Sequence, residues 1–295
     1  MANFPIRTDL ALEAREYIEE ANGEMRGVIV DTYSDADDTV QVTHVQITTK
    51  NGAKAMGKPI GTYITLEADH LTEPDEDYHR EVSLVLAKQL QNLLPDFQEE
   101  KSILVVGLGN RDVTADALGP EVIDHLNITR HLLRQFGHAA YSCEKVHEIS
   151  GIVPGVMGKT GMETAEIVRG VVDSTKPDVI VVIDALAARS TRRLTRTIQI
   201  TNTGIQPGSC VGNHRDSLTE DTLGVPVIAI GIPTVVDAAT IVNDAIGHLH
   251  PINEEARETL YDMHNMYVTA KDIDATIKRL GFTLSEALNI AFSLC

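Results

Sequence analysis

The second half of the chain contains three short runs of mainly apolar residues. They occupy residues 102–107, 178–183 and 226–230, and helical spacing follows the first and third runs at about 120–135 and 236–246. Apolar runs of this length are typical of strands that are buried on both faces. Because buried strands alternate with helices, the pattern predicts an α/β fold of three layers, α/β/α, with a mostly parallel sheet.

The first hundred residues have a different pattern. Residues 39–49 alternate between polar and apolar positions and are rich in β-branched side chains, which predicts a strand with one face in solvent. A second strand near residues 61–66 is expected to pair with it across Asn51-Gly52, and helical spacing follows at 78–94. We expect these strands at an edge of the sheet or as a subdomain, and further helices at 253–293.

Composition and charge limit the classes of function. The chain of 295 residues has a formal net charge of −18, which argues against direct nucleic-acid binding because such binding needs a basic surface. No apolar stretch approaches the roughly 18 residues of a membrane-spanning helix, and the N-terminus has no apolar segment typical of a secretory signal. We therefore expect a cytoplasmic protein with neither a membrane nor a nucleic-acid partner.

Two glycine-rich segments resemble nucleotide-binding motifs, but each lacks a required residue. The segment that begins Gly107-Leu-Gly109 has Asp112 where a dinucleotide-binding fingerprint needs its third glycine. The segment Gly158-Lys159-Thr160 has Val153 where a P-loop needs a glycine. The sequence also contains neither a His-Glu-x-x-His zinc motif nor a Gly-x-Ser-x-Gly nucleophile motif. We expect no cofactor and no metal.

Two aspartates occupy positions at which parallel sheets bind ligands. Asp184 directly follows the run at 178–183, and Asp116 lies in the loop between the run at 102–107 and the next helix. Ligands bind beyond the carboxyl ends of parallel strands, so neighbouring strands would bring the two carboxylates together. Such a pair can hold one proton, supplying a base that activates water and an acid that protonates a leaving amide nitrogen. Each aspartate could instead cap a following helix.

Longer segments around these aspartates resemble the germination protease family of spore-forming bacteria. The similarity runs in order from near the N-terminus to about residue 245. The matching segments are Arg7–Ala11, Val106–Asn110, Val113–Pro120, Gly151–Gly158, Ile183–Arg189, Pro207–Ser209, Gly212–Asn213 and Thr222–Ala238. The resemblance implies that Asp116 and Asp184 are the catalytic pair of an aspartic-type peptidase.

The resemblance also implies a biological role. Members of this family degrade, during germination, the small acid-soluble proteins that coat DNA in the spore core. They are homotetramers, made as zymogens that activate themselves by removing a short N-terminal propeptide. We therefore expect this chain to act as an endopeptidase on small acid-soluble spore proteins and to form a homotetramer.

The propeptide junction follows from the same resemblance. Substrates of the family are cut after Glu in sequences like Thr-Glu-(Phe or Ile)-Ala-x-Glu, and residues 8–13, Thr-Asp-Leu-Ala-Leu-Glu, are a conservative copy. We expect self-cleavage between Asp9 and Leu10, and cleavage of substrates after Glu or Asp. Residues 1–9 would then be the propeptide, and residues 10–295 a single α/β peptidase domain.

The chain departs from the family pattern near the expected site. The departures are Ala115 in place of proline, Arg111-Asp112 in place of an aromatic residue and asparagine, Cys210 in place of glycine and His214 in place of lysine. Both aspartates are retained, so these changes bear on substrate selection more than on activity. Arg189 and Arg215 are candidates for binding the acidic side chain of a substrate, because arginine pairs with carboxylates through two hydrogen bonds.

Three alternatives remain open. The first is a metal-assisted peptidase similar to the hydrogenase-maturation peptidases, which the expected fold resembles, and in this chain His147 or His214 would have to complete the metal site. The second is a non-catalytic nucleotide-binding module that uses the turn at Gly107–Gly109, against which Asp112 argues. The third is a storage or interaction protein that has lost its activity.

Overall fold

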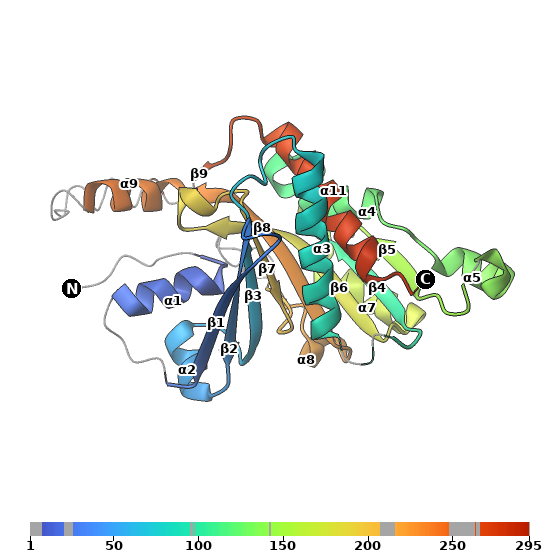
Figure 1. The fold of residues 1–295 in the computed structure, drawn as a ribbon. Helices are drawn as coiled ribbons and strands as arrows, with labels where there is room; N and C mark the ends of the chain where they lie inside the picture. Colours follow the sequence, from blue (N-terminus) through green and yellow to red (C-terminus); the bar gives the residue numbers. More distant parts are fainter. Residues whose placement is uncertain are drawn as a thin grey trace.

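A mixed sheet of nine strands runs through the described part of the protein (Figure 1). The computed structural model describes residues 8–20, 26–94, 96, 98–141, 143–206, 216–247, 263 and 266–294. The strands are β1 Val28–Asp35, β2 Val40–Ile47, β3 Gly61–Glu67, β4 Ser102–Gly107, β5 Glu148–Ile152, β6 Val179–Ala188, β7 Thr197–Thr201, β8 Val227–Asp237 and β9 Tyr267–Val268. Their order is β1-β2-β3-β7-β8-β6-β4-β5, and β9 pairs with β8 off this path.

The sheet has a parallel half and an antiparallel half. Strands β5, β4, β6 and β8 pair in parallel, whereas β8, β7, β3, β2 and β1 pair antiparallel. The apolar runs of the sequence form the parallel strands, and nearly all residues of β4 and β6 are buried. The antiparallel half ends at β1, whose residues are half-buried or exposed. The strand-rich N-terminal region therefore lies at an edge of the sheet.

Helices cover both faces of the sheet. They are α1 Ala11–Glu20, α2 Lys50–Met56, α3 Glu76–Leu93, α4 Leu118–Asp124, α5 Arg130–Phe136, α6 Met157–Thr160, α7 Thr164–Thr175, α8 Glu220–Leu223, α9 Ala238–Gly247 and α11 Ile273–Ala291. Within the described ranges, no helix is long and apolar enough to cross a membrane.

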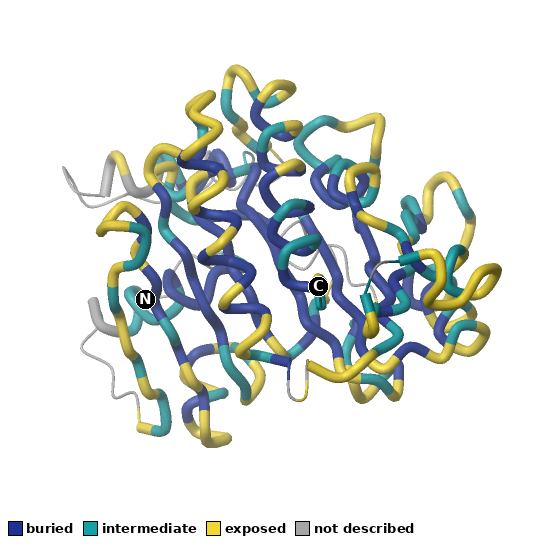
Figure 2. Tube along the Cα trace, turned by 45° about the vertical axis from the view of Figure 1, so that its right-hand side comes forward, coloured by how far each residue is buried: buried dark blue, intermediate teal, exposed yellow. Residues whose placement is uncertain are grey.

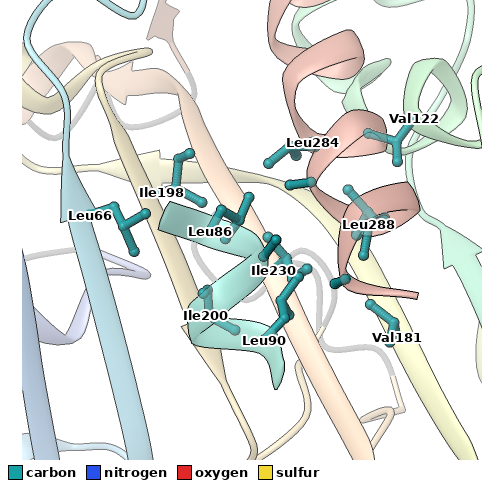
Figure 3. Packing of buried hydrophobic residues seen from close by; sticks show 14 of the residues in the cluster. Leu66, Leu86, Leu90, Val122, Val181, Ile198, Ile200, Ile230, Leu284 and Leu288 are labelled. Carbon is teal, nitrogen blue, oxygen red and sulfur yellow. The ribbon is translucent and has the colours of Figure 1, made fainter. Parts of the chain in front are cut away.

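Alternate side chains of the strands belong to apolar clusters on opposite faces of the sheet. On one face, α3, α4 and α11 enclose the larger cluster, which includes Leu86, Val122, Val181, Ile230 and Leu288 (Figure 3). On the other face α7 packs against the intervening residues of β4 and β6, while α1 and α2 cover the antiparallel strands. The central strands of the sheet are accordingly among the most buried parts of the molecule (Figure 2). The prediction of a three-layer α/β/α fold is confirmed.

A predicted helix and a predicted turn differ in detail from the structure. The helix expected over 120–135 is two helices, α4 and α5, separated by residues 125–129. The turn expected at Asn51-Gly52 lies inside helix α2. Thr49 begins this helix by accepting a hydrogen bond from the Gly52 N–H at 3.1 Å, and Gly57 ends it in the left-handed conformation. These two caps let a helix form through an Asn-Gly pair that would otherwise favour a turn.

Strand β6 continues beyond the point at which the apolar run stops. It extends to Ala188 instead of ending at Ile183, because β8 runs beside it and supplies hydrogen-bond partners as far as Val236. The residues after Asp184 are therefore part of a strand, and the alternative in which Asp184 caps a helix is wrong.

Candidate active site

The loop after β4 positions Asp116 through two close backbone contacts. A β-carbon on Gly107 would lie 2.3 Å from the carbonyl oxygen of Gly119, near the start of α4. Gly109 has a φ of +117°, and a β-carbon there would lie 1.8 Å from the carbonyl oxygen of Asp116. That same oxygen accepts a hydrogen bond from the Asn110 N–H at 3.0 Å. The Gly-Leu-Gly segment thus serves close packing of the backbone around the aspartate.

A hydrogen bond from β8 holds the short 3₁₀ turn Thr114–Asp116, and the segment after β9 binds the same residue of β8. The hydroxyl of Thr234 donates to the carbonyl oxygen of Ala115 at 2.6 Å, and the hydroxyl of Thr269 donates to the carbonyl oxygen of Thr234 at 2.7 Å. Thr234 is only 1% exposed, so little water competes for its hydrogen bond. The turn that carries Asp116 is therefore tied to the strand next to β6.

Asp184 lies at the point where β6 extends past its neighbour β4. Gly107, the last residue of β4, pairs with Ile183, so Asp184 is the first residue of β6 beyond that end. On its other side Asp184 pairs with Gly231 of β8. The residue is 8% exposed, and its Oδ1 accepts a hydrogen bond from the Ala185 N–H at 2.9 Å. A buried acidic side chain in an apolar strand calls for a functional explanation.

One cavity joins the two aspartates. It has a volume of about 420 Å³, and Asp116, Asp184 and Asp9 all line it. Most of the other lining residues belong to the ends of β6 and β8 or to the loops after β4 and β5. The cavity thus lies beyond the carboxyl ends of the parallel strands, the usual position of ligand sites in such sheets.

The N-terminal segment is bound to the same region. Asp9 makes two hydrogen bonds with Ala187 of β6: its N–H donates to the Ala187 carbonyl at 3.1 Å, and its Oδ2 accepts from the Ala187 N–H at 2.9 Å. The carbonyl oxygen of Asp9 accepts hydrogen bonds from Lys58 Nζ at 2.7 Å and from Gln199 Nε2 at 3.1 Å. Gln199 Oε1 in turn accepts from the Ala11 N–H at 2.6 Å. The backbone between Asp9 and Ala11 is therefore held on both sides.

Leu10 anchors this segment in the apolar interior. Its side chain has no exposed surface and belongs to a cluster with Leu186, Ala188 and Val236. Ala11, the first residue of α1, is equally buried, in the cluster that lies under α1 and α2. The start of α1 is thus part of the core.

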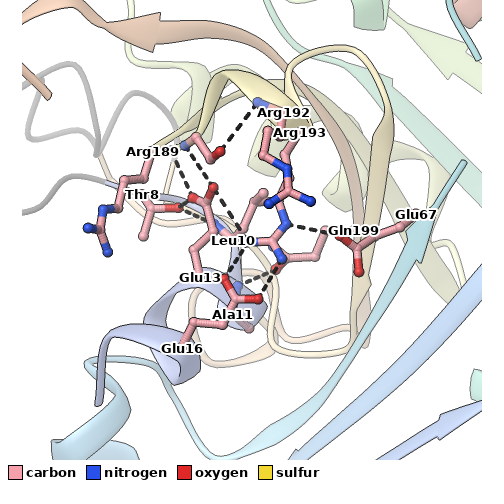
Figure 4. A network of polar contacts seen from close by, with 11 residues as sticks. Thr8, Leu10, Ala11, Glu13, Glu16, Glu67, Arg189, Arg192, Arg193 and Gln199 are labelled. Atoms are coloured by element: carbon pink, nitrogen blue, oxygen red, sulfur yellow. Dashed lines mark hydrogen bonds and ion pairs between the residues drawn. The ribbon is translucent and has the colours of Figure 1, made fainter. Parts of the chain in front are cut away.

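The carboxylate of Glu13 lies below this anchor and is only 2% exposed (Figure 4). It accepts hydrogen bonds from the Arg189 N–H at 2.8 Å and from the Ser190 N–H at 2.9 Å. The hydroxyl of Thr8 donates to Oε2 of the same carboxylate, and the guanidinium of Arg193 lies 3.7 Å from Oε1. Glu13 therefore joins the N-terminal segment to the end of β6.

Arg193 fastens helix α1 to the sheet. Its guanidinium donates two hydrogen bonds to Glu16, both at 2.7 Å, and one to Glu67 at 3.1 Å. The hydrogen bond from Arg193 is the main reason why the pKa of Glu16 lies below its ordinary value. This ion-pair network and the Leu10 anchor together fix the position of the segment that begins at Thr8.

The structure describes one of the two predicted arginines. Arg189 follows β6 directly, and its main-chain N–H, as described, donates to Glu13. Arg215 lies outside the described residues, as does His214.

His147 lies far from the two aspartates. It precedes β5 at the amino ends of the parallel strands, whereas Asp116 and Asp184 lie at their carboxyl ends. Its Nδ1 accepts a hydrogen bond from the Lys101 N–H at 3.0 Å, and burial lowers its pKa to about 4. Among the residues that the structure describes, no group of three or more His, Cys, Asp or Glu side chains is arranged to hold a metal ion.

The family model and the curated relatives agree on one family. The family model described as germination protease matches residues 7–260. The chain is 44% identical to the germination protease of Caldanaerobacter subterraneus subsp. tengcongensis, with 97% of this chain and 94% of that protein covered. It is also 44% identical to the germination protease of Clostridium tetani, over 97% of this chain and 95% of that protein. A solved structure, the [NiFe] hydrogenase maturation protease HycI from Thermococcus kodakarensis, is 17% identical with a TM-score of 0.34, over 68% of this chain and 98% of that one. The match to curated relatives over 97% of the chain and the match of the family model to residues 7–260 show that the chain belongs to the germination protease family, a family of spore proteases.

Proposed function

We propose that this protein is a self-processing endopeptidase that initiates the degradation of small acid-soluble spore proteins, with Asp116 and Asp184 as its aspartic-type catalytic pair. The observation that carries the proposal is the cavity that both aspartates line. Asp184 is buried in its strand, while Asp116 is half-buried on its turn. Two carboxylates in unlike surroundings can share one proton. One can then remove a proton from water while the other protonates the leaving nitrogen.

We further propose that residues 1–9 are a propeptide, removed by cleavage between Asp9 and Leu10 to leave a single domain of residues 10–295. Asp9 lines the same cavity as the two aspartates. Its carbonyl oxygen already accepts hydrogen bonds from the ammonium group of Lys58 and the amide of Gln199. Donors in these positions would stabilise the negative charge that develops on this oxygen when water attacks the carbonyl carbon.

The contacts of Asp9 also support cleavage of substrates after Glu or Asp, in sites like Thr-Glu-(Phe or Ile)-Ala. The Ala187 N–H donates to the carboxylate of Asp9, and the acidic residue of a substrate bound in its place would meet the same donor. Arg189 lies two residues farther along the chain. We propose Arg189 and Arg215 as charged partners for that carboxylate, since arginine binds carboxylates strongly.

Assembly and location are part of the same proposal. We propose a homotetramer that acts in the spore core, as the family resemblance implies. Light scattering on the purified protein should report four times the mass of one chain, and the mass of one or two chains would contradict the tetramer.

The experiment that tests the function starts from the full-length chain. Wild-type protein is incubated with a small acid-soluble spore protein and excess chelator, and the masses of protein and products are measured over time. Asp116→Asn and Asp184→Asn are run beside it. The matched control is Asp112→Asn, which removes an exposed carboxylate of the same loop that pairs with Lys159.

We expect the wild type and the control to lose nine residues and to cut the substrate after Glu. We expect neither event in the two active-site variants. Undiminished cleavage by Asp184→Asn would contradict the assignment of the pair, and cleavage that stops with chelator would support the metal-assisted alternative. If the wild type cuts neither itself nor the substrate, the proposed function fails.

A further inference from the structure

The proposed cleavage would create a charge inside the protein. Hydrolysis of the bond between Asp9 and Leu10 adds one water molecule, so that Asp9 gains a carboxylate and the nitrogen of Leu10 becomes an amine. An α-amine has an ordinary pKa of about 7.7–8.0 and is therefore mostly protonated at neutral pH. Leu10 has no exposed surface, and a buried charge is stable only when it has a partner of opposite sign.

The carboxylate of Glu13 is such a partner, and only the hydroxyl group of Thr8 separates it from the nitrogen of Leu10. The N–H of Leu10 donates to Thr8 Oγ1 at 3.1 Å, and the Thr8 hydroxyl donates to Glu13 Oε2. Thr8 thus bridges the nitrogen that would become the new terminus and a carboxylate that is 2% exposed. Cleavage removes Thr8 with the propeptide. The space that the Thr8 hydroxyl occupied, between the nitrogen of Leu10 and the carboxylate of Glu13, is then open.

From this arrangement we infer that Glu13 is the binding site for the α-ammonium group of Leu10 in the processed chain. The inference rests on the proposed cleavage between Asp9 and Leu10. An ammonium group has three N–H donors, so it can replace the hydroxyl of Thr8 at Glu13 Oε2 and gain a charge-assisted hydrogen bond. The apolar contacts of the Leu10 side chain with Leu186, Ala188 and Val236 keep the new terminus beside the carboxylate.

The other charged groups nearby are already engaged. The guanidinium of Arg193, which faces Glu13, also binds Glu16 and Glu67. The ammonium of Lys58 contacts the carbonyl oxygen of Asp9 and, being a cation, offers no partner to the new ammonium group. Glu13 is thus the acidic group placed to receive the new terminus.

The site links processing to the catalytic strand. The carboxylate of Glu13 is held by the main-chain N–H groups of Arg189 and Ser190, the residues that directly follow β6. Asp184 lies on this same strand. Glu13 is therefore a positioning residue, through which the processed terminus keeps the end of β6 in place.

The test measures how fast the α-amine of Leu10 reacts in processed protein. Wild-type and Glu13→Gln chains are allowed to process, then treated at pH 8 with limiting acetic anhydride, and the acetylated terminus is quantified by mass spectrometry. A peptide with the sequence of residues 10–15 provides the reference rate. In the wild type we expect the amine to react about fivefold more slowly than in the peptide, which is the effect at pH 8 of raising a pKa of about 8 by one unit. In Glu13→Gln we expect it to approach the rate of the peptide.

Thr8→Val is the matched control. It removes the bridging hydroxyl from the precursor but leaves a processed chain identical to the wild type, so only the precursor should lose thermal stability. Glu13→Gln should lower the melting temperature of the processed chain more than that of the precursor. A Leu10 amine that reacts at the rate of the peptide in wild-type protein, or at the same rate in both processed proteins, would overturn the inference.

Two further measurements keep the inference separate from the proposed function. If the wild type does not process itself, a chain that begins at Leu10 is released from an N-terminal fusion by the protease specific for that fusion, and its amine is labelled in the same way. If Glu13→Gln does not fold, a wild-type chain released with one extra glycine before Leu10 replaces it. The added residue moves the ammonium away from Glu13, so we expect a lower melting temperature, and an unchanged one would contradict the site.

Discussion

Replacing Gly109 by alanine should separate the role of the aspartate loop from general stability. The new β-carbon would lie 1.8 Å from the carbonyl oxygen of Asp116, so the loop must move. The φ of +117° adds strain of about 1–3 kcal/mol for a residue other than glycine. Loss of the hydrogen bond from the Asn110 N–H to the same oxygen adds about 1 kcal/mol. We expect the free energy of unfolding to fall by about 2–4 kcal/mol, with Asp116 displaced from the cavity.

The matched control for this variant is Gly57→Ala. Gly57 also has a positive φ, of +61°, but no atom lies within 4 Å of a β-carbon placed there. Its substitution should cost about 1 kcal/mol, from backbone strain alone. Guanidinium unfolding at pH 7 gives both free energies, and mass spectrometry gives the rate at which nine residues are lost. Equal losses of stability in the two variants, with undiminished self-processing by Gly109→Ala, would refute this account of the loop.

Two predictions concern the pH dependence of stability and the anchoring of α1. Burial lowers the pKa of His147 to about 4, so the protein should lose stability as the pH falls from 6.5 towards 4. The expected loss is about 2–3 kcal/mol in the free energy of unfolding between pH 7 and pH 4.5. Urea unfolding should show this loss in the wild type and not in His147→Asn, and equal pH dependence of the two proteins would contradict the prediction. Arg193→Met should lower the free energy of unfolding, but by less than the about 3–5 kcal/mol of a fully buried pair, because the Glu16 side chain is 43% exposed. The pKa of Glu16 is lowered in the folded protein, so the contribution of Glu16 to stability is present above its ordinary pKa and is lost as the pH falls through the lowered value. The difference in free energy of unfolding between Arg193→Met and the wild type should therefore shrink in acid. A difference that stays constant with pH would count against this ion pair.

The parallel half of the sheet could be predicted because both faces of its strands are buried. Burial on two faces requires uninterrupted apolar runs, and such runs are visible in the sequence at 103–106 and 179–183. The extension of β6 past Asp184 could not be predicted, because it depends on β8, which lies more than 40 residues away in the chain. Strand β1 was not predicted either, since its partly exposed residues, Val-Ile-Val-Asp-Thr-Tyr-Ser-Asp, do not alternate regularly.

The candidate site was only partly visible in the sequence. The positions of Asp116 and Asp184 relative to buried strands suggested that they could meet, and the structure places both on one cavity. The contacts of Asp9 with Lys58 and Gln199 join residues 49 and 190 positions apart, and no local pattern signals them. Glu13 had no signal of its own, because an acidic residue in the first turn of a helix is ordinarily explained by the helix dipole.

The burial of Leu10 has a consequence for the molecularity of maturation. A second enzyme molecule could reach the bond before Leu10 only after the start of α1 had unfolded, whereas the cavity with Asp116 and Asp184 already includes Asp9 of the same chain. The proposed cut is therefore a first-order reaction, and its half-life should not change when the precursor is diluted. The rate of maturation of such a precursor is set by the chemistry within one chain and not by the frequency at which two chains collide.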